Sequence, residues 1–177
     1  TLGMHQATLS SVADPANMTH LSLLTLLREG ALGPLRIGSS RESVTSLLGP
    51  PSDVSTIRLS HSGPPAILKY GDVEFHFGSP SEQHLTLIHA DVLTGPGRTV
   101  AFTARVSLDP WVLCPSLSVT EFLAAAANAG LLLQPMAHPD PDLVVFSTAA
   151  GGQVGFYADP PAGEPPFLWF SLTESAA

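Results

Sequence analysis

Hydrophobic and polar residues alternate in several short segments of the chain, separated by glycine and proline. Val73, Phe75 and Phe77 alternate with Glu74 and His76, so this segment is predicted to be a strand with one apolar and one polar face. Similar segments predict further strands over residues 54–59, 66–70, 85–90, 99–107, 131–136, 143–148, 153–158 and 167–172. With 17 prolines and 15 glycines, long helices are disfavoured.

Other segments follow a helical period. The first begins with Asp14 as N-cap and Pro15 at the first helical position, or alternatively at Thr19, and its leucines recur at helical spacing until Gly30. Two later segments begin with capping boxes, in which a serine and a glutamate satisfy each other's exposed amides. The boxes are Ser39 with Glu42 and Ser118 with Glu121.

Much of the segment from Gly33 to Phe77 recurs later in the chain. Five short matches follow in the same order at offsets of about 75 to 81 residues, which predicts a tandem repeat. Aligning the capping boxes instead of the Ser-Val-Thr matches shifts the second helix by about three or four residues, and both alignments stay open. The pairs are 33–38 with 109–114, 43–45 with 118–120, 47–48 with 122–123, 67–70 with 143–146, and 72–76 with 153–157.

The predicted fold class is α+β. Two tandem units, each a helix followed by four strands, are expected to form one antiparallel sheet with the helices on one face and the other face open for contact. Residues 1–13 are expected to be a tag or flexible arm, 14–32 an N-terminal helix, 33–98 the first repeat, and 99–177 a bridging strand with the second repeat. Together they are predicted to form one pseudo-symmetric domain.

The segment 35–51, LRIGSSRESVTSLLGPP, is followed by a strand, the turn at Tyr70 and the strand around Phe75. This arrangement resembles the small outer-membrane-assembly lipoproteins, and a doubled unit resembles the β-lactamase-inhibitory-protein-like fold. The resemblance implies a protein-binding scaffold rather than a catalyst. The chain departs from these proteins in having neither a lipidated N-terminal cysteine nor disulfides, since Cys114 is its only cysteine. No binding residue carries over.

Charge is unevenly distributed along the chain. Residues 1–105 contain all seven lysines and arginines and eight acids, whereas residues 106–177 contain seven acids and no lysine or arginine. The second part is expected to repel nucleic acid, whose binding depends on phosphate neutralisation, and to attract a basic protein. A simpler interpretation is that the acids keep an apolar protein in solution.

Residues on the open face and in the acidic loops are predicted to contact the partner: Glu74, His76, Asp140, Asp142, Tyr157 and Trp169. Tyrosine and tryptophan are enriched as interface anchors, although Trp169 has an alternative interpretation as a core residue beneath the loop 160–166. Another use of the open face is a metal site of Glu74, His76 and His89, because a carboxylate and two imidazoles suit zinc or iron. No cofactor is predicted.

The sequence lacks the motifs of common enzymes. It contains no Gly-x-Ser-x-Gly elbow, and Gly151-Gly152 lies between predicted strands instead of before a helix, where a phosphate loop would place it. We therefore predict a non-enzymatic protein-binding module, such as a bacterial immunity or inhibitor protein for a basic toxin. The alternative is a small-ligand or metal-binding protein that uses the open face.

No apolar run of the sequence approaches the roughly 20 residues that span a bilayer, and residues 1–17 lack the features of a signal peptide. A cytoplasmic location is therefore expected. Thr1 is not a natural translation start, so we expect a trimmed or tagged chain, and a removed leader stays open as an alternative.

Overall fold

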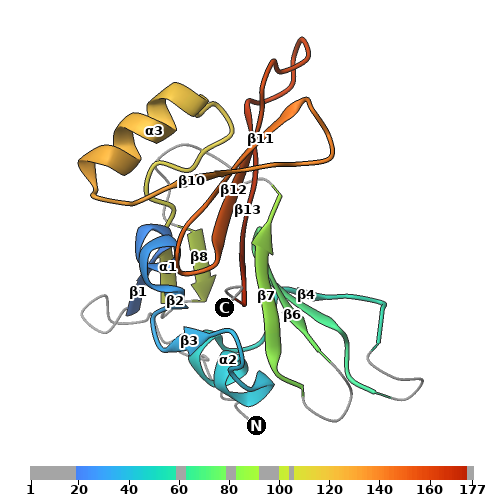
Figure 1. Cartoon of the computed structure of the whole chain (residues 1–177). Coiled ribbons are helices and arrows are strands. Elements are labelled where there is room, and N and C mark those ends of the chain that lie inside the picture. Colours follow the sequence, from blue (N-terminus) through green and yellow to red (C-terminus); the bar gives the residue numbers. More distant parts are fainter. Residues whose placement is uncertain (1–18, 59–62, 79–82, 92–99, 104–105, 175–177) are drawn as a thin grey trace, which may run out of the picture.

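An eight-stranded antiparallel sheet is the largest sheet among the residues that the structure describes (Figure 1). The computed structural model describes residues 19–58, 63–78, 83–91, 100–103 and 106–174. In spatial order, the strands of the sheet are β10 (Gln134–Met136), β11 (Leu143–Ser147), β12 (Gly152–Tyr157), β13 (Phe167–Thr173), β7 (Leu85–Ala90), β6 (Val73–Phe77), β5 (Ile67–Tyr70) and β4 (Asp53–Val54).

The alternating segments form strands largely where the sequence predicts them. β6 and β7 have the predicted bounds, and Val73, Phe75 and Phe77 are buried while Glu74 and His76 are half-buried. β4 and β10 are shorter than predicted. At β10 the reason is a helix cap, because the backbone N–H of Leu131 bonds to Ala126 O and the leucine packs into the core.

The described residues contain three helices: α1 (Leu23–Glu29), α2 (Arg41–Leu48) and α3 (Val119–Asn128). At α3 both hydrogen bonds of the predicted Ser118–Glu121 capping box are present. At α2 the predicted cap is wrong by one residue. Ser40 accepts the bond from Ser43 N, and the Ser39 hydroxyl instead accepts the backbone N–H of Arg36.

The N-terminal helix is shorter than its predicted range of 14–32. Residues Thr19–Ser22 form a strand, β1, which pairs in parallel with β9 (Val106–Asp109). The predicted bridging strand over 99–107 is also wrong as a single strand, because it divides into β8 (Val100–Thr103) and β9, which form an antiparallel pair outside the large sheet. The predicted arm at 1–13 lies outside the described residues.

A short hairpin connects α1 to α2. Its strands are β2 (Ala31–Leu32) and β3 (Leu35–Arg36), and its turn contains Gly33 with a positive φ of 61°. Glycine adopts this left-handed conformation without the steric cost that a side chain would add. The hairpin continues into the Ser40 cap and so sets where α2 begins.

One hydrophobic core joins the helices to one face of the large sheet. Phe122 of α3 lies against Phe146 and Phe156 of the sheet, with ring centroids 6.0 and 5.1 Å apart. Buried residues of α1 and α2 belong to the same core, and Figure 1 shows α3 beside the β10–β13 half of the sheet and α2 beside the β4–β7 half. None of the helices in the described ranges is long and apolar enough to cross a membrane.

Candidate functional site: the outer face of the sheet

The strands turn alternate side chains away from the core, and we call the surface that these residues form the outer face. One row of residues that are paired from strand to strand across the large sheet is polar in all of its strands. The neighbouring row, which includes Phe75, Ile88 and Leu172, is buried in the core. The polar row consists, from β4 to β10, of Asp53, Lys69, Glu74, His89, Ser171, Gln153, Ser147 and Gln134.

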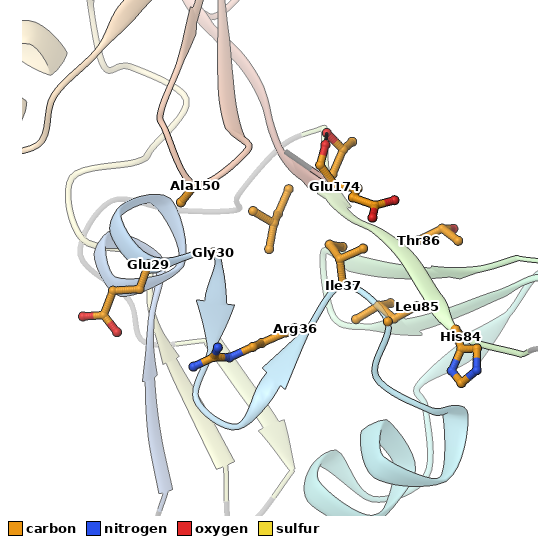
Figure 2. A pocket seen from close by; sticks show the side chains of 12 residues that line it. Glu29, Gly30, Arg36, Ile37, His84, Leu85, Thr86, Ala150 and Glu174 are labelled. Carbon is orange, nitrogen blue, oxygen red and sulfur yellow. Dashed lines mark hydrogen bonds between the residues drawn. The ribbon is translucent and has the colours of Figure 1, made fainter. Parts of the chain in front are cut away.

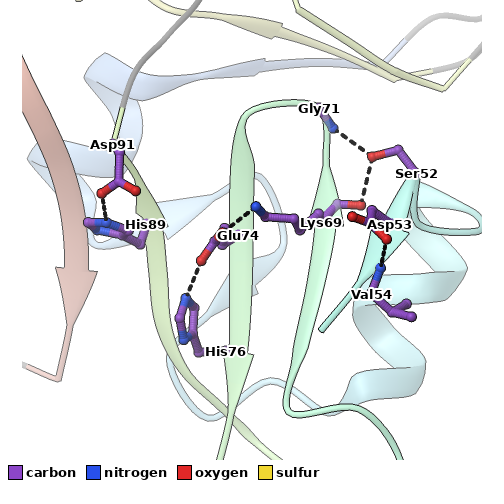
Figure 3. A network of polar contacts seen from close by, with 9 residues as sticks. All are labelled: Ser52, Asp53, Val54, Lys69, Gly71, Glu74, His76, His89 and Asp91. Carbon is purple, nitrogen blue, oxygen red and sulfur yellow. Dashed lines mark hydrogen bonds and ion pairs between the residues drawn. The ribbon is translucent and has the colours of Figure 1, made fainter. Parts of the chain in front are cut away.

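Glu74 is the centre of an ion-pair network on this face (Figure 3). Its Oε1 lies 2.7 Å from Lys69 Nζ on β5, and its Oε2 accepts a hydrogen bond of 2.9 Å from His76 Nε2. Burial acts to raise the pKa of Glu74, but the hydrogen bonds from Lys69 and His76 outweigh it and hold the pKa below its ordinary value. Glu74 is therefore ionised at neutral pH, and both of its oxygens are occupied.

His89 faces the same network from β7 but bonds in another direction. Its Nε2 lies 2.6 Å from Asp91 Oδ1 (Figure 3), and its ring centroid is 6.4 Å from that of His76. Sequence reasoning missed Asp91, although its spacing of two from His89 would place both on one face of an extended chain. β7 ends at Ala90, as predicted, so Asp91 lies just outside the strand and was not considered with its side chains.

The predicted metal ligands Glu74, His76 and His89 share the outer face but are not gathered into one group. The described residues contain no group of three histidine, cysteine, aspartate or glutamate side chains that could hold a metal ion. Lys69 is one reason, because its ammonium group occupies the Glu74 carboxylate oxygen that a metal ion would need.

Trp169 lies on the outer face of β13, across from Gly155 of β12. A methyl group placed on Gly155 would lie only 2.5 Å from Trp169 Cε2, so the indole covers the glycine backbone. Trp169 is half-buried and is not part of the hydrophobic core, which does not support its interpretation as a core residue. Its ring centroid is 6.2 Å from that of His89.

Tyr157 is also half-buried and ends β12, in the strand next to Trp169 as predicted. Its cross-strand partner on β11 is Leu143. Tyr157 and Trp169 therefore occupy neighbouring strands of the outer face, at the end of the sheet where β12 leads into the loop before β13.

The predicted acidic residues Asp140 and Asp142 are exposed in the loop between β10 and β11. The loop is ordered by local bonds, since Asp140 Oδ1 accepts the backbone N–H of Asp142 at 3.0 Å. Ala158 N bonds to Asp142 O at 2.8 Å, which holds this loop beside the end of β12. The exposed Asp159 follows directly, so Asp142 and Asp159 lie at the same end of the sheet as Tyr157.

A cavity of about 400 Å³ lies elsewhere, between β3, β7 and the end of β13 (Figure 2). Its lining includes the charged or polar side chains of Glu29, Arg36, His84 and Glu174 and the apolar Ile37. Sequence reasoning missed this cavity, because its residues come from separate elements and form no local motif.

No protein-family model, curated protein or solved structure matches the chain.

Proposed function

We propose that the protein is a non-enzymatic module that binds a basic protein through the outer face and the acidic loops beside it. The observation that carries the proposal is the exposure of every acid in residues 106–177, a part of the chain without lysine or arginine. A surface with this charge attracts a basic partner and speeds its association. Four of these acids lie in the loops next to β11, β12 and β13, whereas Asp109 lies on β9 and Glu121 on α3. The seven acids are Asp109, Glu121, Asp140, Asp142, Asp159, Glu164 and Glu174.

The outer face has the other features that are typical of a protein interface. It combines an extended polar row with the half-buried aromatic side chains of Tyr157 and Trp169. Aromatic residues are enriched among interface residues that contribute most to binding, and surrounding polar groups exclude water from them. Glu74 and His76 would lie at the centre of the first half of this surface.

We further propose that the sheet is built from two repeats. The strand order supports this, because β4 to β7 and β10 to β13 form two four-stranded halves that meet at the β7–β13 pair. A capped helix precedes each half, α2 in the first and α3 in the second. This is the layout that the resemblance to a doubled protein-binding scaffold implies.

The specific role that we propose is that of a cytoplasmic bacterial immunity or inhibitor protein. Toxins that act on nucleic acid are basic because they must bind phosphates. An acidic protein can neutralise such a toxin by charge complementarity and fast association. Binding is then expected to weaken as salt concentration rises, because salt screens exposed charges.

Site-specific photo-crosslinking in cells of the source organism tests the proposal. A photoreactive residue at Gln153, on the outer face, is expected to cross-link to a basic protein. The same residue at the exposed Ala124 of α3, on the helix side, serves as the control. The captured protein is then purified and its affinity measured at low and high salt. Equal capture from both positions, or salt-independent affinity, would contradict the proposal.

Small-molecule binding is a second candidate, which the cavity favours. Its volume of about 400 Å³ lies within the range of about 300–1,000 Å³ common for ligand sites. A thermal-shift screen of small molecules against the protein and its Arg36→Ala variant tests this function. A ligand that stabilises both proteins equally would not use the cavity. Metal analysis of the protein and of His76→Ala tests the metal alternative on the outer face.

A further inference from the structure

We propose that Trp169 and Asp91 together form a site for one arginine side chain of the basic partner. This inference rests on the proposed function and adds the chemical group that is recognised. It names one position on the outer face, at the end of β7 and the start of β13, where a carboxylate follows one strand at the register position of an aromatic residue on the next.

The sheet places the two residues together. Ala90, the last residue of β7, pairs with Phe170 on β13, so Asp91 follows at the register position of Trp169. His89 links them, because its Nε2 lies 2.6 Å from Asp91 Oδ1 and its ring centroid is 6.2 Å from that of Trp169. The histidine thus orients the carboxylate and at the same time lies next to the indole.

Asp91 has a carboxylate oxygen that can accept a hydrogen bond from a partner. Its side chain is 80% exposed although it is bound to His89. Figure 3 shows one oxygen on His89 and the second turned away from it. Among the described residues, no lysine or arginine forms an ion pair with Asp91. The carboxylate is therefore oriented by His89 and is not paired with a lysine or arginine of the described residues.

Trp169 is held in place without being buried. The indole lies over Gly155, where any larger residue would displace it, and it remains half-exposed. Tryptophan is the aromatic side chain that attracts cations most strongly over its ring. The ring therefore supplies a fixed apolar surface with a preference for positive charge.

The surrounding charge favours a cation as well. The nearest cationic group on the polar row, Lys69, is already paired with Glu74 at 2.7 Å. The loop before β11 and the loop after β12 add the exposed carboxylates of Asp142 and Asp159. Arginine fits these features better than lysine, because its planar guanidinium can stack on an aromatic ring while its N–H groups bond to a carboxylate.

Isothermal titration calorimetry with a tetra-arginine peptide tests the site. The matched peptide with four citrullines has nearly the same shape but no charge, and it is expected not to bind. Asp91→Asn and Trp169→Leu are each expected to weaken binding of tetra-arginine by about five- to tenfold. The control is Asp53→Asn, which removes an equal charge at the far end of the polar row and is expected to change affinity by less than about twofold.

A variant with a smaller change at Trp169 separates loss of binding from loss of folding. Trp169→Phe keeps an aromatic ring and is expected to bind with an affinity between those of the wild type and Trp169→Leu. Thermal unfolding of each variant establishes that it is folded at the temperature of the titration.

Two results would overturn the site. In one, Asp91→Asn and Trp169→Leu bind tetra-arginine as the wild type does, while the double variant Asp140→Asn and Asp142→Asn loses binding. The acidic loops would then bind the partner without the Trp169 site, and the proposed function would stand. In the other, the wild type binds tetra-arginine no better than the citrulline peptide. Cross-linking at Gln153 decides separately whether the proposed function also fails.

Discussion

Replacement of Gly155 by alanine tests the position of Trp169, on which the outer face depends. The indole atoms Cε2, Nε1 and Cζ2 lie 2.5, 2.6 and 2.9 Å from the point that an alanine methyl would occupy. Favourable carbon contacts are found at about 3.5–4.0 Å. The indole must therefore move by about 1 Å or more, and on a half-exposed surface it is expected to move outward.

The expected cost follows from two opposing effects. Overpacking of this kind destabilises a protein by about 1–3 kcal/mol. Alanine in a strand regains about 0.5–1 kcal/mol relative to glycine, and Gly155 has no positive φ that would oppose a side chain. We expect a net destabilisation of about 1 kcal/mol, which lowers the Tm of a chain of this size by about 2–4 °C.

The assay combines unfolding with tryptophan emission. In a Trp111→Phe background, Trp169 is the remaining tryptophan of the two in the chain. Its emission is then expected to shift to longer wavelength in Gly155→Ala, because the indole becomes more exposed. A double-mutant cycle isolates the contact. With Trp169→Val already present, Gly155→Ala is expected to stabilise the protein by about 0.5 kcal/mol, since the clash is gone.

The reasoning would be refuted by a Gly155→Ala protein with unchanged emission and a higher Tm than the wild type. The same substitution should then have equal effects in the presence and absence of Trp169. Such a result would mean that the indole does not lie on β12 at Gly155.

Three further predictions concern the core, a helix cap and the Glu74 network. Phe122→Ala is expected to destabilise by about 3–5 kcal/mol, because the ring is 0% exposed, whereas Leu123→Ala, at 40% exposure, should cost below about 1 kcal/mol in the same denaturant titration. Ser118→Ala removes the capping box and should cost about 1 kcal/mol by the same measurement. Because the folded-state pKa of Glu74 is lowered, its ionised form stabilises the fold above about pH 4.5, and this contribution is lost as the pH falls through the folded pKa. Glu74→Gln should therefore remove that part of the pH dependence of stability in an acid-unfolding titration. An acid-unfolding curve identical to that of the wild type would contradict the network.

The local signals of the sequence predict much of this fold. Alternation places Phe75 in the core and Glu74 on the opposite face, and the Ser118–Glu121 box locates the start of α3. These features depend on residues within a few positions of one another. Their physical causes, side-chain periodicity and the satisfaction of helix-end amides, are therefore visible in a short window.

The misplaced elements depend on partners far away in the chain. Thr19–Ser22 is a strand because it pairs with β9, and no local pattern shows that pairing. Ser39 and Ser40 are equally good caps by composition, and Ser39 is held outside the helix by backbone bonds to β7, including Leu85 N to Ser39 O at 2.8 Å. Tertiary contacts thus decide between locally equivalent alternatives.

In the candidate site, too, contacts within one strand could be predicted from the sequence, whereas contacts between strands could not. Period-2 alternation predicts that Glu74 and His76 share a face, and their 2.9 Å hydrogen bond agrees with that prediction. The contact of Trp169 with Gly155 depends on the β12–β13 register and on the irregularity between Gly155 and Phe156. A shift of one residue would move Trp169 to the other face, so sequence alone could not predict this contact.

The most direct test of the account is to map which amides respond to a basic ligand. The protein, labelled with ¹⁵N, is titrated with the tetra-arginine peptide while backbone amide shifts are recorded by NMR. The account predicts that the changes concentrate on β7, β12, β13 and the acidic loop at Asp140 and Asp142, and that they diminish as salt is added. Changes concentrated on α1, α2 and α3 would contradict it.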